Sequence, residues 1–121
     1  MAKNMEIALL FDFYGEMLPN VQRDMIEFYY EDDLSLSEIA ENRGISRQGV
    51  RDSIKRAEMQ LLEMEDRLGL AKQFREIQET AAAIRGAANE IAIYNDRFNF
   101  SREIDERARR IMALAEQLAK N

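Results

Sequence analysis

The sequence contains no cysteine and no histidine. Disulfides and thiolate metal ligands are therefore excluded, and so are imidazole metal ligands. Catalysis by a Ser–His or Cys–His pair is excluded as well, because the base is missing. One proline and five glycines among 121 residues leave little room for long loops or for a sandwich of short strands.

A long uncharged apolar run is also lacking. Residues 1–6 have no basic stretch followed by an apolar segment. Residues 7–18 carry Asp12 and Glu16 and are too short to span a bilayer. We therefore expect no signal peptide, no membrane partner and a cytoplasmic location.

What is present is an acidic, amphipathic composition. Apolar residues make up 46% of the chain and charged residues 33%. This composition suits amphipathic helices that pack around a core with one face exposed to solvent. The net charge of −6 argues against a generic nucleic-acid binder, because duplex affinity comes largely from cations that meet phosphates. A local basic face can nevertheless exist within that average.

Apolar residues recur at three- and four-residue steps along most of the chain, which predicts an all-α fold. Helices are expected over residues 4–18, 19–30 and 36–43, from Ser46 to Leu68, over 70–91, and after Ser101, with a turn over 94–100. The inward-facing residues predicted for the first two helices include Ile7, Leu10, Phe11, Tyr14, Leu18, Val21, Met25, Ile26 and Tyr29. Residues 1–68 are predicted to form a helix-turn-helix domain, and residues 69–121 a C-terminal helical extension.

The extension has a heptad-like spacing of apolar residues. The predicted inward positions are Leu70, Phe74, Ile77, Ala81, Ile84, Ala88 and Ile91, followed by Ile104, Ala108, Ile111, Ala115 and Leu118. Four- and three-residue steps of this kind are typical of helices that pack along a common seam. Either a hairpin within one chain or a homodimer interface satisfies the spacing.

Residues 36–57 carry the pattern of a helix-turn-helix. Ala40 allows two helices to approach closely, and Gly44 provides a tight turn four residues later. Ile39, Ile45, Val50 and Ile54 are predicted to lock the crossing. Ser35 or Ser37 can cap the first helix, and Ser35 and Glu38 have capping-box spacing. Ser46 can cap the second helix.

The outward face of the second helix is basic. Between Arg43 and Arg56 there are five cations and one anion, Asp52. Arginine can pair with guanine, glutamine with adenine, and lysine with phosphate. The predicted nucleic-acid-binding residues are Arg43, Ser46, Arg47, Gln48, Arg51, Lys55 and Arg56.

Two other interpretations stay open for this face. Arg51 or Lys55 could instead pair with neighbours such as Asp52 or Glu58 on an ordinary solvated surface. A helix-turn-helix can also serve as a protein-binding module. Gly49 lowers the stability of the helix by roughly 1 kcal/mol relative to alanine. It would also let another backbone approach, which suits a DNA groove and a protein partner equally.

The motifs resemble two known families. Leu18–Arg23, Phe28–Tyr30, Leu34–Ala40 and Gly44–Arg47 resemble region 4 of bacterial sigma factors, whose second helix reads the promoter major groove. The pattern is also similar to the YlxM-like family of small bacterial proteins over roughly residues 5–75, through Leu10–Tyr14, Tyr29–Asp33, Ser46–Gln48 and Ile54–Arg56. The chain departs from that family pattern at Gly49, Arg51 and Ser53.

The YlxM-like resemblance implies a regulator associated with the signal recognition particle pathway, since genes of that family neighbour those of the targeting GTPase Ffh or its receptor FtsY. The sequence thus predicts a regulatory protein that binds duplex DNA. The alternative is an adaptor that modulates Ffh or FtsY without binding DNA, with the acidic balance suiting basic partners.

An enzyme is not predicted. Asp32 and Asp33 could ligate Mg²⁺, but no phosphate loop, second ligand cluster or nucleophile–base set accompanies them. We therefore predict no catalytic residue, metal, cofactor or small-molecule substrate.

Overall fold

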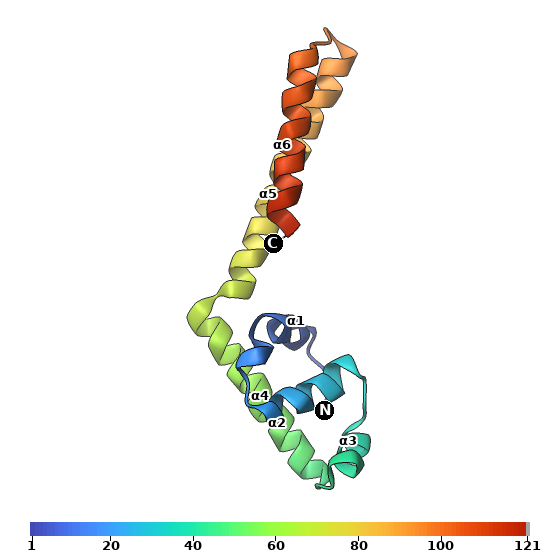
Figure 1. Cartoon of the computed structure of the whole chain (residues 1–121), viewed down its shortest axis with the longest axis vertical. Helices are drawn as coiled ribbons and strands as arrows, with labels where there is room; N and C mark the ends of the chain where they lie inside the picture. Colours follow the sequence, from blue (N-terminus) through green and yellow to red (C-terminus); the bar gives the residue numbers. More distant parts are fainter. Residues whose placement is uncertain (121) are drawn as a thin grey trace. The chain divides into compact units, whose positions relative to one another are not determined.

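The structure is a computed structural model that describes residues 1–120. Every regular element in that range is helical, which confirms the all-α fold class. The chain divides into an N-terminal unit, Met1–Ala71, and a second unit that begins at Lys72 (Figure 1). The α-helices are α1 Met5–Tyr14, α2 Asn20–Ile26, α3 Leu36–Arg43, α4 Arg47–Leu68, α5 Leu70–Arg97 and α6 Arg102–Lys120.

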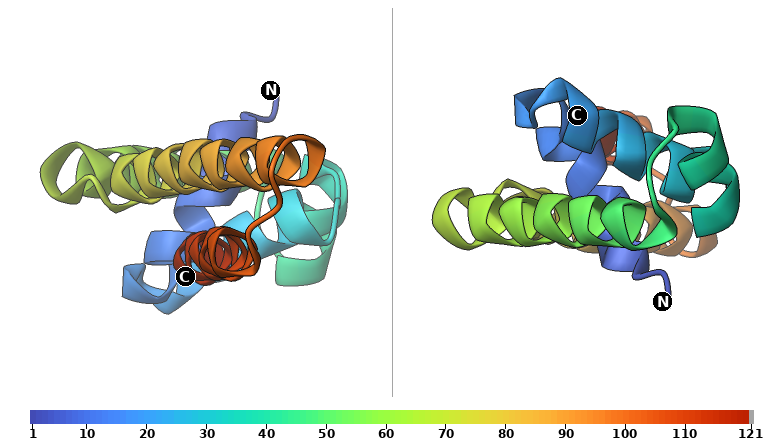
Figure 2. Two further views of the ribbon diagram at one scale, coloured as in Figure 1. Left: turned by 90° about the horizontal axis from the view of Figure 1, so that it is seen from above. Right: turned by 90° about the horizontal axis from the view of Figure 1, so that it is seen from below.

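In the N-terminal unit, α1, α2 and α3 all pack against α4 (Figures 1 and 2). The large side chains that are almost completely buried there are Ile7, Leu10, Tyr14, Ile26, Ile39, Val50, Ile54 and Leu61. Burial of each aliphatic side chain of this size contributes about 1.5–3 kcal/mol. This core fixes the first half of α4, which carries the predicted site.

The first two helices are shorter than predicted. α1 ends at Tyr14 and continues as a 3₁₀ segment, Gly15–Met17. Leu18 is extended at ψ 148°, because a residue before proline is disfavoured in the α region. α2 gives way to a π-helical turn, Glu27–Glu31. The inward position predicted for Val21 is wrong, since this side chain is 63% exposed.

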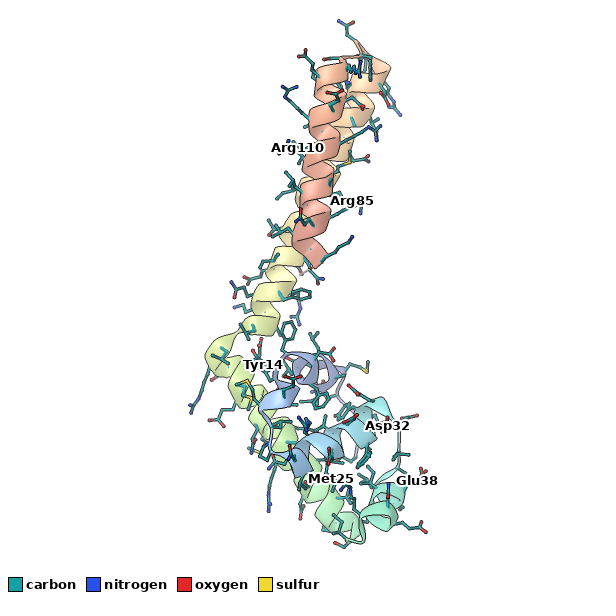
Figure 3. The ribbon with its side chains drawn as sticks, in the orientation of Figure 1. Tyr14, Met25, Asp32, Glu38, Arg85 and Arg110 are labelled. Atoms are coloured by element: carbon teal, nitrogen blue, oxygen red, sulfur yellow. The ribbon has the colours of Figure 1, made fainter. Side chains whose placement is uncertain are left out.

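Gly69 separates α4 from α5, as predicted. It adopts a left-handed φ of 64°, and its N–H donates to the Glu65 carbonyl at 2.8 Å. Tyr14 is labelled in Figure 3. This buried residue donates its hydroxyl proton to Glu65 Oε1 at 2.6 Å and accepts the Leu70 N–H at 3.0 Å. Glu65 Oε1 also accepts the Ala71 N–H at 3.0 Å, so two side chains satisfy the first amides of α5.

The second unit is an antiparallel pair formed by α5 and α6, which lie side by side in Figures 1 and 2. The turn predicted over residues 94–100 is wrong at its start, because α5 continues to Arg97. Asn95 helps to close the connection: its side-chain amide donates to the Ser101 carbonyl at 2.8 Å, and its oxygen accepts the Ser101 N–H at 2.9 Å. Ser101 Oγ accepts the Ile104 N–H at 3.4 Å at the start of α6.

Most of the large residues predicted to face inward in this hairpin are exposed, although Phe74 and Ile77 are half-buried. The buried residues are alanines and Asn95, whereas Ile84 is 42% exposed and Ile91 is 49% exposed. On α6, Ala108 and Ala115 are buried while Ile104, Ile111 and Leu118 are each at least 40% exposed. The predicted inward positions are therefore confirmed for the alanines and wrong for the exposed isoleucines and Leu118.

Candidate nucleic-acid interface

The helix-turn-helix forms from α3, a three-residue turn and α4. Ser35 and Glu38 form a complete capping box at the start of α3. Gly44 has a left-handed φ of 68°, a conformation that glycine adopts without a Cβ penalty. Its N–H and that of Ile45 both donate to the Ala40 carbonyl, which ends α3. These features confirm the predicted caps and the predicted turn.

Ile39, Val50 and Ile54 are fully buried at the crossing of α3 and α4, and Ala40 is 9% exposed. The same role predicted for Ile45 is wrong, since its side chain is 44% exposed. Three of the four predicted apolar side chains thus hold the second helix in place. Ile45 remains at the surface beside the start of that helix.

Gly49 lies against the cap of α4. Ser46 Oγ accepts the Gly49 N–H at 3.0 Å, and a Cβ at position 49 would meet that same oxygen at 3.2 Å. Apart from the adjoining residues and the backbone of α4 itself, only this oxygen and Ile45 Cδ1 in the described chain come within 4 Å of such a Cβ. The local function of the glycine is therefore to leave room for the serine cap.

The first three turns of α4 present a basic surface, here called the basic face and defined by Arg47, Arg51, Lys55 and Arg56. All four side chains are exposed, and none forms an ion pair within residues 1–120. Arg47, Arg51 and Lys55 follow one another at four-residue steps, which places them along one side of the helix. The surface thus offers several cationic groups to a partner.

The neighbouring carboxylates are engaged elsewhere. Asp52 Oδ1 accepts the side-chain amide of Gln48 at 3.0 Å, and Glu58 accepts the hydroxyl proton of Tyr30. Burial, together with this bond to Glu58, raises the pKa of Tyr30 to about 12. The alternative interpretation, in which Asp52 or Glu58 neutralises Arg51 or Lys55, is not the arrangement found.

The other predicted site residues differ in their contacts. Arg43 Nη2 pairs with Asp24 Oδ2 at 2.9 Å, and its guanidinium lies 4.9 Å from the centre of the Phe28 ring. Arg43 therefore ties the end of α3 to the preceding helical segment. Gln48 is exposed next to Arg47, and both line a hollow of about 370 Å³ with Met1, Leu36 and Arg51.

Sequence reasoning missed the side chains that anchor the N-terminus near this site. Tyr30 accepts the Asn4 N–H at 3.1 Å, and Tyr29 donates to the Met1 carbonyl at 3.0 Å. Lys3 pairs with Asp33 and lies 4.8 Å from the Tyr29 ring centre. The Lys3 ammonium also holds the pKa of Asp33 below its usual value. In the sequence, only the adjacent tyrosines before an acidic turn indicated that these side chains could hold the N-terminus.

Within residues 1–120, no group of three or more acidic side chains is arranged to hold a metal ion, and the Asp32–Asp33 pair has no third ligand. None of the helices combines the length and apolar character needed to cross a bilayer.

Comparison with known proteins identifies the family. The profile described as "Putative helix-turn-helix protein, YlxM / p13 like" matches residues 1–99. A UPF0122 protein of Clostridium kluyveri is 43% identical over 84 residues, which cover 69% of this chain and 76% of that protein. A UPF0122 protein of Thermoanaerobacter sp. is 48% identical over 79 residues, covering 65% and 68% of the two chains.

A UPF0122 protein of Bacillus thuringiensis is 46% identical over 88 residues, which cover 73% of this chain and 80% of the relative. The matched profile ends before α6 and describes a helix-turn-helix protein rather than an enzyme. The chain belongs to the UPF0122 family of YlxM/p13-like helix-turn-helix proteins.

Proposed function

We propose that this chain is a cytoplasmic regulatory protein whose α4 enters the major groove of duplex DNA, in the manner of sigma region 4. The observation that carries the proposal is the basic face, with four exposed cations and no internal ion pair in the described chain. A helix-turn-helix presents the N-terminal residues of its second helix to base edges. Arg47, Gln48 and Arg51 occupy that position.

The roles within the face follow from side-chain chemistry and position. Arg47 and Arg51 are suited to bidentate contacts with guanine, and Gln48 to adenine. Lys55 and Arg56 lie one to two turns further along α4 and are suited to phosphates. Ser46 supports the helix start through its cap on Gly49, and Arg43 supports α3 through Asp24.

The test is fluorescence anisotropy of the full chain with a labelled duplex pool that carries about 20 randomised base pairs, at low salt. Arg47→Ala and Arg51→Ala are each expected to weaken binding by about 1–3 kcal/mol. Lys55→Ala should reduce the slope of log affinity against log salt by about 1. We expect the wild-type affinity to fall steeply with added salt.

Arg67→Ala is the matched control. Arg67 lies on the same helix, is exposed, and pairs with Glu63 at 2.9 Å, so its removal changes the net charge equally at the far end of α4. An exposed pair of this kind contributes little to stability. Equal affinities for Arg47→Ala and Arg67→Ala, or no binding by the wild type at low salt, would refute the proposal.

A second candidate function is that of an adaptor for the signal recognition particle pathway, with Ffh or FtsY as the partner. The net charge of −6 favours it, because an acidic surface complements a basic RNA-binding protein. Purified Ffh and FtsY, each with and without the particle RNA, would be tested for binding and for a change in GTP hydrolysis. No binding and an unchanged hydrolysis rate would exclude this role.

A further inference from the structure

The hairpin of α5 and α6 is held together by small side chains. Ala81, Ala88 and Ala92 of α5 are buried, as are Ala108 and Ala115 of α6. Alanine at a helix–helix seam allows the two backbones to approach closely. The register is fixed by the Asn95–Ser101 hydrogen bonds at one end and by the Arg85–Glu116 ion pair, at 3.1 Å, towards the other.

Large apolar side chains lie beside this seam instead of inside it. Two rows at seven-residue steps, here called the heptad face, consist of Ile84, Ile91 and Phe98 and of Ile104, Ile111 and Leu118. Each of these residues is between 40% and 69% exposed. A seven-residue repeat on both helices is the spacing with which helices of a bundle pack against one another.

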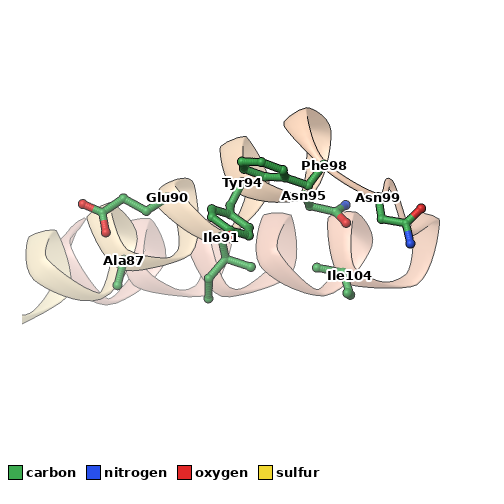
Figure 4. A pocket seen from close by; sticks show the side chains of 8 residues that line it. All are labelled: Ala87, Glu90, Ile91, Tyr94, Asn95, Phe98, Asn99 and Ile104. Carbon is green, nitrogen blue, oxygen red and sulfur yellow. The ribbon is translucent and has the colours of Figure 1, made fainter.

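Both rows open on the same side of the hairpin. Ile91, Tyr94 and Phe98 line one cavity of about 630 Å³ together with Ile104 of α6 (Figure 4). A second cavity is lined by Ala82, Arg85, Gly86, Asn89 and Met112, residues that are mostly small or polar. The two rows of large apolar residues therefore lie on one side of the hairpin, as expected for a helix pair that buries one face against another layer. On the other side, Ile93 is exposed one turn after Asn89.

The extent of the heptad face matches a protein interface. At the exposed fractions given above, its six residues leave on the order of 600 Å² in water, at the upper end for a patch on a monomer. Two copies of the face would together exceed the roughly 1,000 Å² that a stable interface requires.

Charges bordering the heptad face indicate which partner fits. Glu90 lines its cavity on the α5 side. On α6, Arg110 directly precedes Ile111, and Arg107 lies one helical turn before it. Glu90 is five residues before Asn95, and Arg107 is six residues after Ser101, so both lie at one height along the hairpin. A face with an acidic edge and a basic edge at the same height is complementary to itself.

We propose that a second copy of this chain covers the heptad face, so that two hairpins form a four-helix bundle. A two-fold axis parallel to the helices places α5 of each copy opposite α6 of the other, where Glu90 meets Arg107 and Arg110 of the second copy. A perpendicular axis would instead place α5 opposite α5 and α6 opposite α6, so that the acidic edge of one copy would not face the basic edge of the other. With the parallel axis, both copies of α5 begin at the same end of the bundle. The inference does not depend on DNA binding.

The first test measures the mass of the nuclease-treated full chain by sedimentation equilibrium over a range of concentrations. The wild type is expected to approach twice its 14.1 kDa. Ile91→Asp and Ile104→Asp should each give monomers, whereas Asn89→Asp on the opposite surface should remain dimeric. A monomeric wild type at every concentration, or an Ile91→Asp variant as dimeric as Asn89→Asp, would overturn the proposal.

The second test uses exposed residues and so avoids a folding defect. Glu90→Arg is expected to raise the dimer dissociation constant about tenfold, since the two-fold axis repeats each exposed pair. The double variant Arg107→Glu/Arg110→Glu should have a similar effect, and all three changes together should restore dimerisation. Failure of that restoration would overturn the pairing of α5 with α6. Duplex anisotropy of Arg47→Ala, measured separately, distinguishes this failure from a failure of the DNA proposal.

Discussion

The two units of this chain fill their interiors in different ways. The N-terminal unit buries isoleucine, leucine, valine and tyrosine side chains completely, whereas the hairpin of α5 and α6 buries alanines and Asn95. Because the hydrophobic contribution grows with the apolar area removed from water, a buried isoleucine stabilises far more than a buried alanine. The N-terminal unit therefore has the more stabilising core. In the hairpin, large side chains such as Ile84 and Ile91 stay partly exposed.

The largest effect should come from truncating the core of the N-terminal unit. The side chain of Ile54 is completely buried. Ile54→Ala is therefore expected to lower the free energy of unfolding by about 2–5 kcal/mol, through lost burial and the cavity that it leaves. Urea denaturation, with hydrogen exchange to resolve the two units, measures the cost. The matched control is Ile93→Ala in α5, where the side chain is 44% exposed and the cost should stay within about 0.5 kcal/mol. Equal losses would contradict the contrast between the units.

Local chemistry explains which parts of the fold could be predicted from the sequence. The cap at Ser35, the left-handed turn at Gly44 and the break at Gly69 depend on residues within one helical turn, and all three predictions are confirmed. The turn predicted over residues 94–100 is wrong at its start, since α5 continues to Arg97. Asn95 binds Ser101 across the connection, a contact that composition does not reveal.

The heptad pattern shows the limit of periodicity more clearly. It aligned Ile84 with Ala88 on one stripe, yet the structure buries the alanine and exposes the isoleucine. Spacing specifies which residues share a side of a helix, but not how closely the next helix approaches. That distance depends on the alanines of α6, which are distant in sequence.

The candidate site was predictable in part for the same reason. The exposed positions of Arg47, Arg51 and Lys55 follow from the periodicity of α4 alone. The ion pair of Arg43 with Asp24 and the bond of Tyr30 to Glu58 require α2 and its π-helical extension to be placed in space. Long-range contacts of this kind decide which charges remain available to a partner.

A smaller effect is expected from enlarging the alanine seam of the hairpin. Ala88 is 2% exposed, so Ala88→Leu should overpack the contact with α6 and cost about 1–3 kcal/mol. Ala83→Leu on the exposed side of α5 makes the same change without that contact and should be nearly neutral. Hydrogen exchange of α5 and α6 amides would report both. Similar protection in the two variants would show that the helices are not closely packed at Ala88.

The smallest expected effect is a loss of stability at alkaline pH that originates in the N-terminal unit. Burial, followed by the hydrogen bond to Glu65, raises the pKa of Tyr14, and burial with the bond to Glu58 raises that of Tyr30 to about 12. A pKa that is higher in the folded chain means that folding retains these protons more tightly. The contribution of the two protonated hydroxyls to the free energy of unfolding is therefore complete below the unfolded pKa of about 10. It is lost as the pH rises through the pKa values of the folded chain.

Urea denaturation at about pH 9 and about pH 11 should show this decrease in the wild type. The double variant Tyr14→Phe/Tyr30→Phe should be less stable at the lower pH, because the hydrogen bonds to Glu65, Leu70, Glu58 and Asn4 are lost. Its stability should nevertheless change less between the two pH values. The single variants assign the share of each tyrosine. If the double variant lost as much stability between the two pH values as the wild type, groups other than these two hydroxyls would cause the alkaline loss. The contacts that join α4 to α1 and to the π-helical turn would then not be its source.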